Sequence, residues 1–141
     1  METIYMIPVN DAYMSDCDCP LCALKEKAET NELDYYLGPS LMEPDTRKIT
    51  NKTGFCPDHL GKLNRREANR LGLGLMLHTH LKDVRDDVMP DLEGSIPGKA
   101  SLFKGRSSDY KSKLNALADK IDKRSRTCPI CDKINDSMTS R

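Results

Sequence analysis

The sequence predicts an all-α fold, a small helical domain held together by a zinc site of three cysteines and one histidine. Three segments rich in helix-forming residues carry apolar side chains at spacings of three and four, the period of one helix face. Cysteines also recur as pairs with two residues between them, a spacing typical of zinc ligands. With 141 residues, 38% hydrophobic and 5% aromatic, the chain can build only a lean core, which a metal cross-link would stabilise.

The first helix is expected over residues 21–37, LCALKEKAETNELDYYL, whose apolar positions fall roughly on one face. The Gly38-Pro39 pair that follows is a helix stop. Residues 38–55 contain two prolines, glycine and several turn-forming polar residues. We therefore expect a long irregular loop there, anchored by a metal.

The longest helical pattern covers residues 57–88, with a possible kink near NRLGLG. Gly72 and Gly74 weaken this helix by about 1 kcal/mol each relative to alanine. We expect close approach of another part of the chain to compensate for that loss.

A linker and a third helix complete the expected organisation. Residues 90–108 are rich in proline, glycine and serine and show no sustained period. Residues 109–125 carry one narrow apolar stripe and predict a helix that docks on another element. The resulting division is a zinc-bound helical domain, a linker, and a C-terminal helix with a second CPxC pair, over residues 1–89, 90–108 and 109–141.

Four residues form the expected metal site: Cys19, Cys22, Cys56 and His59, from the motifs CPLC and CPDH. Three thiolates and one imidazole are a common closed tetrahedral set for Zn²⁺. The proline after the first cysteine of each pair predicts that each pair starts a helix, where the dipole favours thiolate. A redox dithiol at Cys19 and Cys22 is the main alternative, but thiol exchange has no use for Cys56 and His59.

Cys128 and Cys131 form a second pair, CPIC, which copies CPLC. Because only DKINDSMTSR follows, without cysteine or histidine, we expect an incomplete metal site. Two ways of completing it are open. Two chains could share an all-cysteine site and form a homodimer, or Cys17, His78 or His80 could supply a ligand. Otherwise we expect Cys17 to be a spare thiol and the two histidines to be hydrogen-bonded at the edge of the core.

Charge and hydropathy exclude several classes of partner. Twenty-two basic residues balance twenty-two acidic ones, so no overall field favours nucleic acid or an anionic membrane. The basic residues near 62–70 and 120–126 are offset by acidic residues, so we do not expect nucleic-acid binding. The longest apolar run, LGLGLML, is too short to span a bilayer. The N-terminal residues show no secretory signal pattern, and we expect a cytoplasmic protein.

Three stretches together resemble an uncharacterised bacterial family of unknown function: YMIPVNDAYMSDCDCPLC, LDYYLGPSLMEPDTRKITNKTGFCPDHL and NRLGLGLMLHTHL. Its members carry paired CPxC and GFCxxH units, and the likeness resumes at CPIC. Members are longer, so the chain resembles their N-terminal two thirds. The resemblance implies zinc knuckles but no assigned biochemical activity.

The functional prediction is a structural zinc-binding helical module that acts as an interaction or assembly platform. The protein partner is unknown. No catalytic constellation is recognised, because four good ligands leave no open position on the metal, so we do not expect an enzyme. A cytoplasmic thiol or zinc redox sensor is the first alternative. A nucleic-acid-binding zinc protein is the second.

Overall fold

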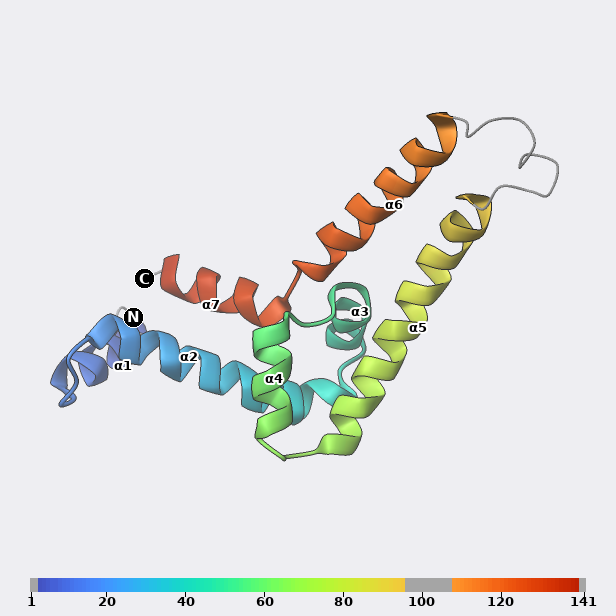
Figure 1. Ribbon diagram of the computed structural model, residues 1–141. Helices are drawn as coiled ribbons and strands as arrows, with labels where there is room; N and C mark the ends of the chain where they lie inside the picture. Colours follow the sequence, from blue (N-terminus) through green and yellow to red (C-terminus); the bar gives the residue numbers. More distant parts are fainter. Residues whose placement is uncertain (1–2, 96–107, 140–141) are drawn as a thin grey trace.

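The computed structural model describes residues 3–95 and 108–139, and within these residues the chain forms helices and no strand (Figure 1). The all-α prediction is confirmed. The elements in order are α1 (Thr3–Met14), α2 (Pro20–Leu37), the 3₁₀ helix η1 (Pro39–Met42), α3 (Pro44–Thr53), α4 (Pro57–Arg65), α5 (Arg70–Ser95), α6 (Ser108–Ser125) and α7 (Pro129–Thr139). None of the described helices is both long enough and apolar enough to cross a membrane.

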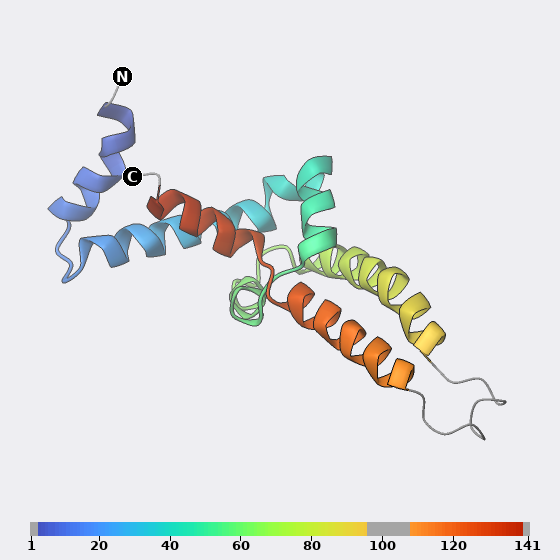
Figure 2. The same ribbon diagram turned by 90° about the horizontal axis from the view of Figure 1, so that it is seen from above.

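The helices form a body and a projecting arm. In the body, α7 lies alongside α2, and α4 packs against α2 and α5 (Figures 1 and 2). The arm is the antiparallel pair of α5 and α6, which extends away from α2 and α7. One apolar cluster joins elements from both ends of the chain, with its buried members in α2, α4, α5 and the start of α7: Leu33, Tyr36, Leu37, Leu63, Leu73, Met76, Cys128, Ile130 and Ile134.

Helix α2 agrees with its prediction to within one residue, and α6 does so too. The prediction of a long irregular loop over residues 38–55 is wrong, because η1 and α3 form most of this segment. Pro39 and Pro44 start these two helices rather than interrupting them. In α3, Asp45 in the first turn and Lys52 in the last turn complement the helix dipole.

The continuous helix expected over residues 57–88 is interrupted between α4 and α5. Glu67 and Asn69 adopt positive φ values of 56° and 50°, which no α-helix accommodates. The Asn69 side chain accepts a hydrogen bond from the Gly72 backbone N–H at 3.0 Å and donates to the Leu37 carbonyl at 2.9 Å. It therefore caps α5 and ties the turn to the end of α2.

Close approach does explain Gly72, since a methyl group there would collide with the Leu41 side chain. It does not explain Gly74, around which a methyl group would meet no atom within 4 Å.

Helix α5 continues through Pro90 to Ser95, over the first residues of the segment that the sequence predicts to be a linker. Residues 96–107 lie outside the described part of the chain. Four ion pairs between described residues of α5 and α6 join the arm. Lys120 contacts Asp87 and Asp91 at 3.0 and 2.7 Å, and Arg124 contacts Asp83 and Asp87 at 2.5 and 2.6 Å. These acidic residues thus neutralise the basic ones, as the sequence suggested.

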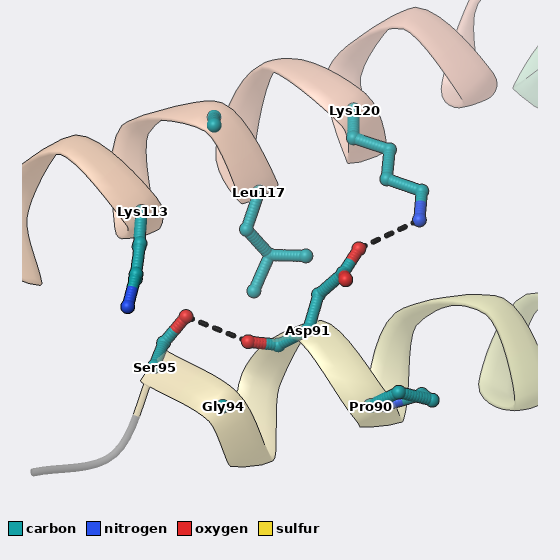
Figure 3. A pocket seen from close by; sticks show the side chains of 8 residues that line it. Pro90, Asp91, Gly94, Ser95, Lys113, Leu117 and Lys120 are labelled. Carbon is teal, nitrogen blue, oxygen red and sulfur yellow. Dashed lines mark hydrogen bonds and ion pairs between the residues drawn. The ribbon is translucent and has the colours of Figure 1, made fainter.

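A cavity of about 450 Å³ lies between α5 and α6 near the end of α5 (Figure 3). Leu117 lines it and is buried, while the Lys120–Asp91 ion pair stands at one side. Ser95 Oγ donates to the Asp91 carbonyl at 2.6 Å. Of these two polar contacts, the Lys120–Asp91 ion pair joins the two helices of the arm, whereas the Ser95 hydrogen bond lies within α5.

Helix α1 was not predicted from the sequence, and of α7 only its start at the CPIC pair was predicted. Helix α1 packs against α2, with Asp11 and Lys27 paired at 3.8 Å. Helix α7 starts at Pro129, directly after Cys128, and contains Cys131. Thr127 Oγ1 donates to the Thr53 carbonyl at 2.8 Å, which fixes the start of α7 beside the end of α3.

Candidate metal centre

Cys56, His59, Cys128 and Cys131 converge on one point between α4 and α7. Each offers one ligand atom, and these four atoms all lie within 4.8 Å of one another. His59 Nδ1 is 3.2 Å from Cys56 Sγ, 3.4 Å from Cys128 Sγ and 3.3 Å from Cys131 Sγ. Cys56 Sγ and Cys131 Sγ are 3.9 Å apart. A single metal ion at the centre of this group could be bound by all four residues.

The local sequence places each ligand pair at the start of a helix. Pro57 is the first residue of α4 and Pro129 the first of α7, where proline costs no hydrogen bond. Cys56 caps α4, and its sulfur accepts the His59 backbone N–H at 3.5 Å. The prediction that the CPxC and CPDH pairs start helices is confirmed for all three pairs, because Pro20 likewise begins α2.

His59 is oriented by a carboxylate. Its Nδ1 faces three sulfur atoms, so Nε2 carries the hydrogen and donates it to Glu29 Oε1 at 2.9 Å. Lys62 Nζ contacts the same oxygen at 2.6 Å and Asp58 at 3.1 Å. The hydrogen bond from Lys62 holds the pKa of Glu29 below its usual value. An ionised carboxylate behind a ligating imidazole fixes the ring and raises its basicity.

The centre is largely shielded from water. Cys128 is 2% exposed and His59 is 5% exposed. Burial, together with the neighbouring Cys128 thiol, raises the pKa of Cys131 to about 12. Without a metal this thiol is protonated at neutral pH, so an ion that binds here must displace the proton.

One side of the centre is open. A pocket of about 530 Å³ is lined by Cys56, His59 and Cys131, and also by charged residues of α2 and α4 and by Cys22. Cys22 is the one member of the first CPxC pair on this wall. The pocket would let an ion enter the centre from solvent.

The structure groups the ligands differently from the sequence prediction. Cys56 and His59 are joined by Cys128 and Cys131, not by Cys19 and Cys22. Among the described residues, neither of the two groups able to hold a metal contains Cys19 or Cys22. The sequence predicts an incomplete site at Cys128 and Cys131, whereas the fold brings the CPDH pair to them and forms a group of four residues that could hold a metal ion.

The physical reason is the packing of α7 on α2. Ile130 is fully buried and Ile134 is 4% exposed in the shared core, whereas Leu21, the residue that matches Ile130 in the first pair, is 56% exposed. The spacing of Ile130, Ile134 and Met138 by four residues is a helical stripe in the sequence. This stripe, read beside the CPIC pair, would have predicted α7 and its docking.

The histidines of α5 lie elsewhere. His80 Nδ1 is 2.7 Å from the Asn51 carbonyl, so it forms the hydrogen bond at the core edge that the sequence suggested. His78 is exposed. Cys17 is also exposed and contacts the Ala12 carbonyl at 3.6 Å.

Comparison of the sequence with curated proteins finds no match, and comparison with solved structures finds none. A family model does match, over residues 1–141 and thus over the whole chain. The bacterial origin that the resemblance implied stays a prediction. The matching model is described as a family of unknown function, DUF6062, and the chain belongs to that family.

Proposed function

We propose that the protein is a structural zinc-binding helical module that serves as an interaction or assembly platform. The observation that carries this proposal is the convergence of three cysteine sulfurs and one imidazole nitrogen from the starts of α4 and α7. Three thiolates and one imidazole are a common ligand set of structural zinc.

The spacing of the ligand atoms supports zinc. A tetrahedral zinc with bonds of about 2.3 Å to sulfur and about 2.0 Å to nitrogen separates two sulfurs by about 3.8 Å, and a sulfur from a nitrogen by about 3.5 Å. The corresponding distances here are 3.9 Å between Cys56 and Cys131, and 3.2 to 3.4 Å from the sulfurs to His59 Nδ1. Small movements of these side chains would bring the ligand atoms to the distances that a bound zinc ion requires.

A structural role follows from the number of ligands. Catalytic zinc keeps one position open for water or substrate, and four protein ligands leave none. The ligands also link distant parts of the chain, since Cys56 and Cys131 are 75 residues apart and His59 and Cys128 are 69 apart. Closing a loop of that length removes about 4 kcal/mol of unfolded-chain entropy, by the relation used for disulfides.

The platform role rests on apolar side chains that the fold leaves exposed. On α5, Leu71 and Leu75 are 77% and 53% exposed, and four residues apart they lie on one helix face. Met42 in η1 is 88% exposed. Grouped exposed apolar side chains on a small domain mark surfaces that bind other proteins.

Nucleic-acid binding is the weaker reading. Lys120 and Arg124 are held by aspartates of α5, Lys62 by Glu29 and Asp58. Basic side chains in such ion pairs are partly neutralised by the carboxylates, so they attract phosphate groups less strongly.

Metal analysis combined with unfolding tests the proposal. The protein, purified under reducing conditions without chelator and supplied with zinc, should retain at this centre one ion per chain that Cys128→Ser abolishes. The same variant should lower the unfolding midpoint strongly, whereas Cys17→Ser, an exposed cysteine outside the centre, should leave both unchanged. A Cys128→Ser protein that keeps every ion and its stability contradicts a metal at this centre.

A pull-down with the wild-type protein, compared with Leu71→Ser/Leu75→Ser, tests the platform. Loss of a specific partner in the double variant, with zinc content and melting unchanged, supports the role. Identical capture by both proteins argues against this face.

A further inference from the structure

We infer that Cys19 and Cys22 are half of a second metal site, which the same pair of a second copy of this chain completes. Such a site would bind a zinc ion through four thiolates and make dimerisation depend on metal. It involves none of the four residues of the centre between α4 and α7, so the two sites can be tested separately.

The first step is the local geometry, which repeats that of the metal centre. Cys19 caps α2 with extended backbone angles, φ −141° and ψ 98°, and its sulfur accepts the Cys22 backbone N–H at 3.2 Å. Cys56 caps α4 in the same way, with its sulfur accepting the His59 N–H. The first CPxC pair is therefore arranged as a two-ligand clamp.

The second step is that this clamp lacks partners within its own chain. In the part of the chain that the structure describes, no group of three or more metal-ligating side chains includes Cys19 or Cys22. The nearest cysteine in sequence, Cys17, is turned toward α1, where its sulfur contacts the Ala12 carbonyl at 3.6 Å. A tetrahedral ion bound here needs two further ligands from another molecule.

The third step concerns the surface around the clamp. Cys22 is exposed and Cys19 partly so. The neighbouring apolar side chains Tyr13, Met14 and Leu21 are 63%, 87% and 56% exposed. They surround the turn between α1 and α2, at the end of the molecule away from the α5–α6 arm (Figure 2). Contact with a second copy would bury this surface.

Symmetry and charge favour a second copy as the occupant. A two-fold axis through the ion presents the same pair twice and supplies four equivalent ligands, with the same apolar residues on both sides of the interface. Zinc with four thiolates carries a net charge of −2. The Lys25 ammonium lies close enough to act electrostatically on Cys22, so two copies would contribute two compensating charges.

The test measures mass and zinc content together. Native mass spectrometry and sedimentation are performed on the wild type, on Cys19→Ser/Cys22→Ser and on Cys17→Ser, each reduced and supplied with zinc. We expect the wild type and Cys17→Ser to form a dimer with three ions, and the double variant to be a monomer with one. Because Cys22 is exposed, Cys19 is partly exposed and serine is also a good helix cap, the double variant should keep the helical circular dichroism of the wild type.

Several results would overturn the inference. A wild-type monomer in excess zinc, a dimer that persists in the double variant, or a second ion held by a monomer each contradicts a shared site. An intrachain disulfide that forms on mild oxidation in the presence of zinc indicates a redox dithiol instead. Cys128→Ser, analysed in parallel, should lose the other ion and keep the shared one, which separates failure of this site from failure of the metal centre.

Discussion

Replacing Glu29 by glutamine should weaken metal binding without removing any ligand. Glu29 Oε1 accepts the His59 Nε2 hydrogen at 2.9 Å while Lys62 contacts the same oxygen at 2.6 Å. Glutamine keeps an oxygen at that position but loses the negative charge. The imidazole then becomes a less basic ligand, and its ring is held less firmly toward the three sulfurs.

The expected loss in zinc affinity is about 10- to 100-fold, the usual cost of removing such a partner, which corresponds to about 1.4 to 2.8 kcal/mol. The side chain of Glu29 is 21% exposed and that of His59 is 6% exposed. Partial contact with water screens the carboxylate, and the glutamine oxygen still accepts a hydrogen bond. Both effects place the expected value near the tenfold end.

Competition with a chromophoric chelator at pH 7 measures this affinity. Glu26→Gln is the matched control, because Glu26 lies on the same helix and lines the same pocket, and the substitution removes the same charge. Lys62→Met removes the lysine that also contacts Glu29. It tests whether Glu29 influences zinc affinity through His59 rather than through Lys62. Equal losses for Glu29→Gln and Glu26→Gln would refute the orienting role and leave only a general charge effect.

Three further predictions concern stability. Gly54→Ala should destabilise the fold by at least about 1 to 2 kcal/mol, because Gly54 has φ 66° and a methyl group would lie 2.5 Å from His80 Nε2; an unchanged denaturant midpoint would contradict this. Ile130→Ala should lower the free energy of unfolding of the zinc-saturated protein by about 2 to 5 kcal/mol, because Ile130 is fully buried. Denaturant unfolding measures this loss, and a smaller value would mean that α7 is only loosely docked. The hydrogen bond from Lys120 holds the pKa of Asp87 below its usual value. The ionised Asp87 therefore stabilises the folded state fully above pH ~3.9, and this stabilisation is lost as pH falls through the lower folded pKa. Thermal melts of Asp87→Asn and the wild type should differ most at neutral pH and converge in acid.

The parts of the fold that follow from local signals could be predicted from the sequence. The prolines after Cys19, Cys56 and Cys128 mark helix starts, and each of them is the first residue of its helix. Over residues 38–55 the prolines predict an irregular loop, whereas Pro39 and Pro44 start η1 and α3. A proline marks either the end of one helix or the first turn of the next, and the residues that follow it decide which.

Half of the candidate site could be predicted and half could not. The two-residue spacing between Cys56 and His59 is typical of metal ligands, so the sequence identified them. The choice between CPLC and CPIC as their partner depends on where each pair is held in space. Both pairs have the same local sequence and both start helices, and the difference lies in Ile130, which packs into the shared core, against Leu21, which does not. Such a contact depends on the whole fold.

The positions of the ligand pairs on either side of the α5–α6 arm have a consequence for the integrity of the molecule. One pair precedes α5 and the other follows α6, so every peptide bond of the arm lies inside the ring that a bound ion closes. A protease that cut between the two helices would leave two fragments that the ion and the contacts of α7 with α2 still hold as one particle. The covalent connection through the arm could then be lost without separating the fragments, and removing the ion would weaken their association.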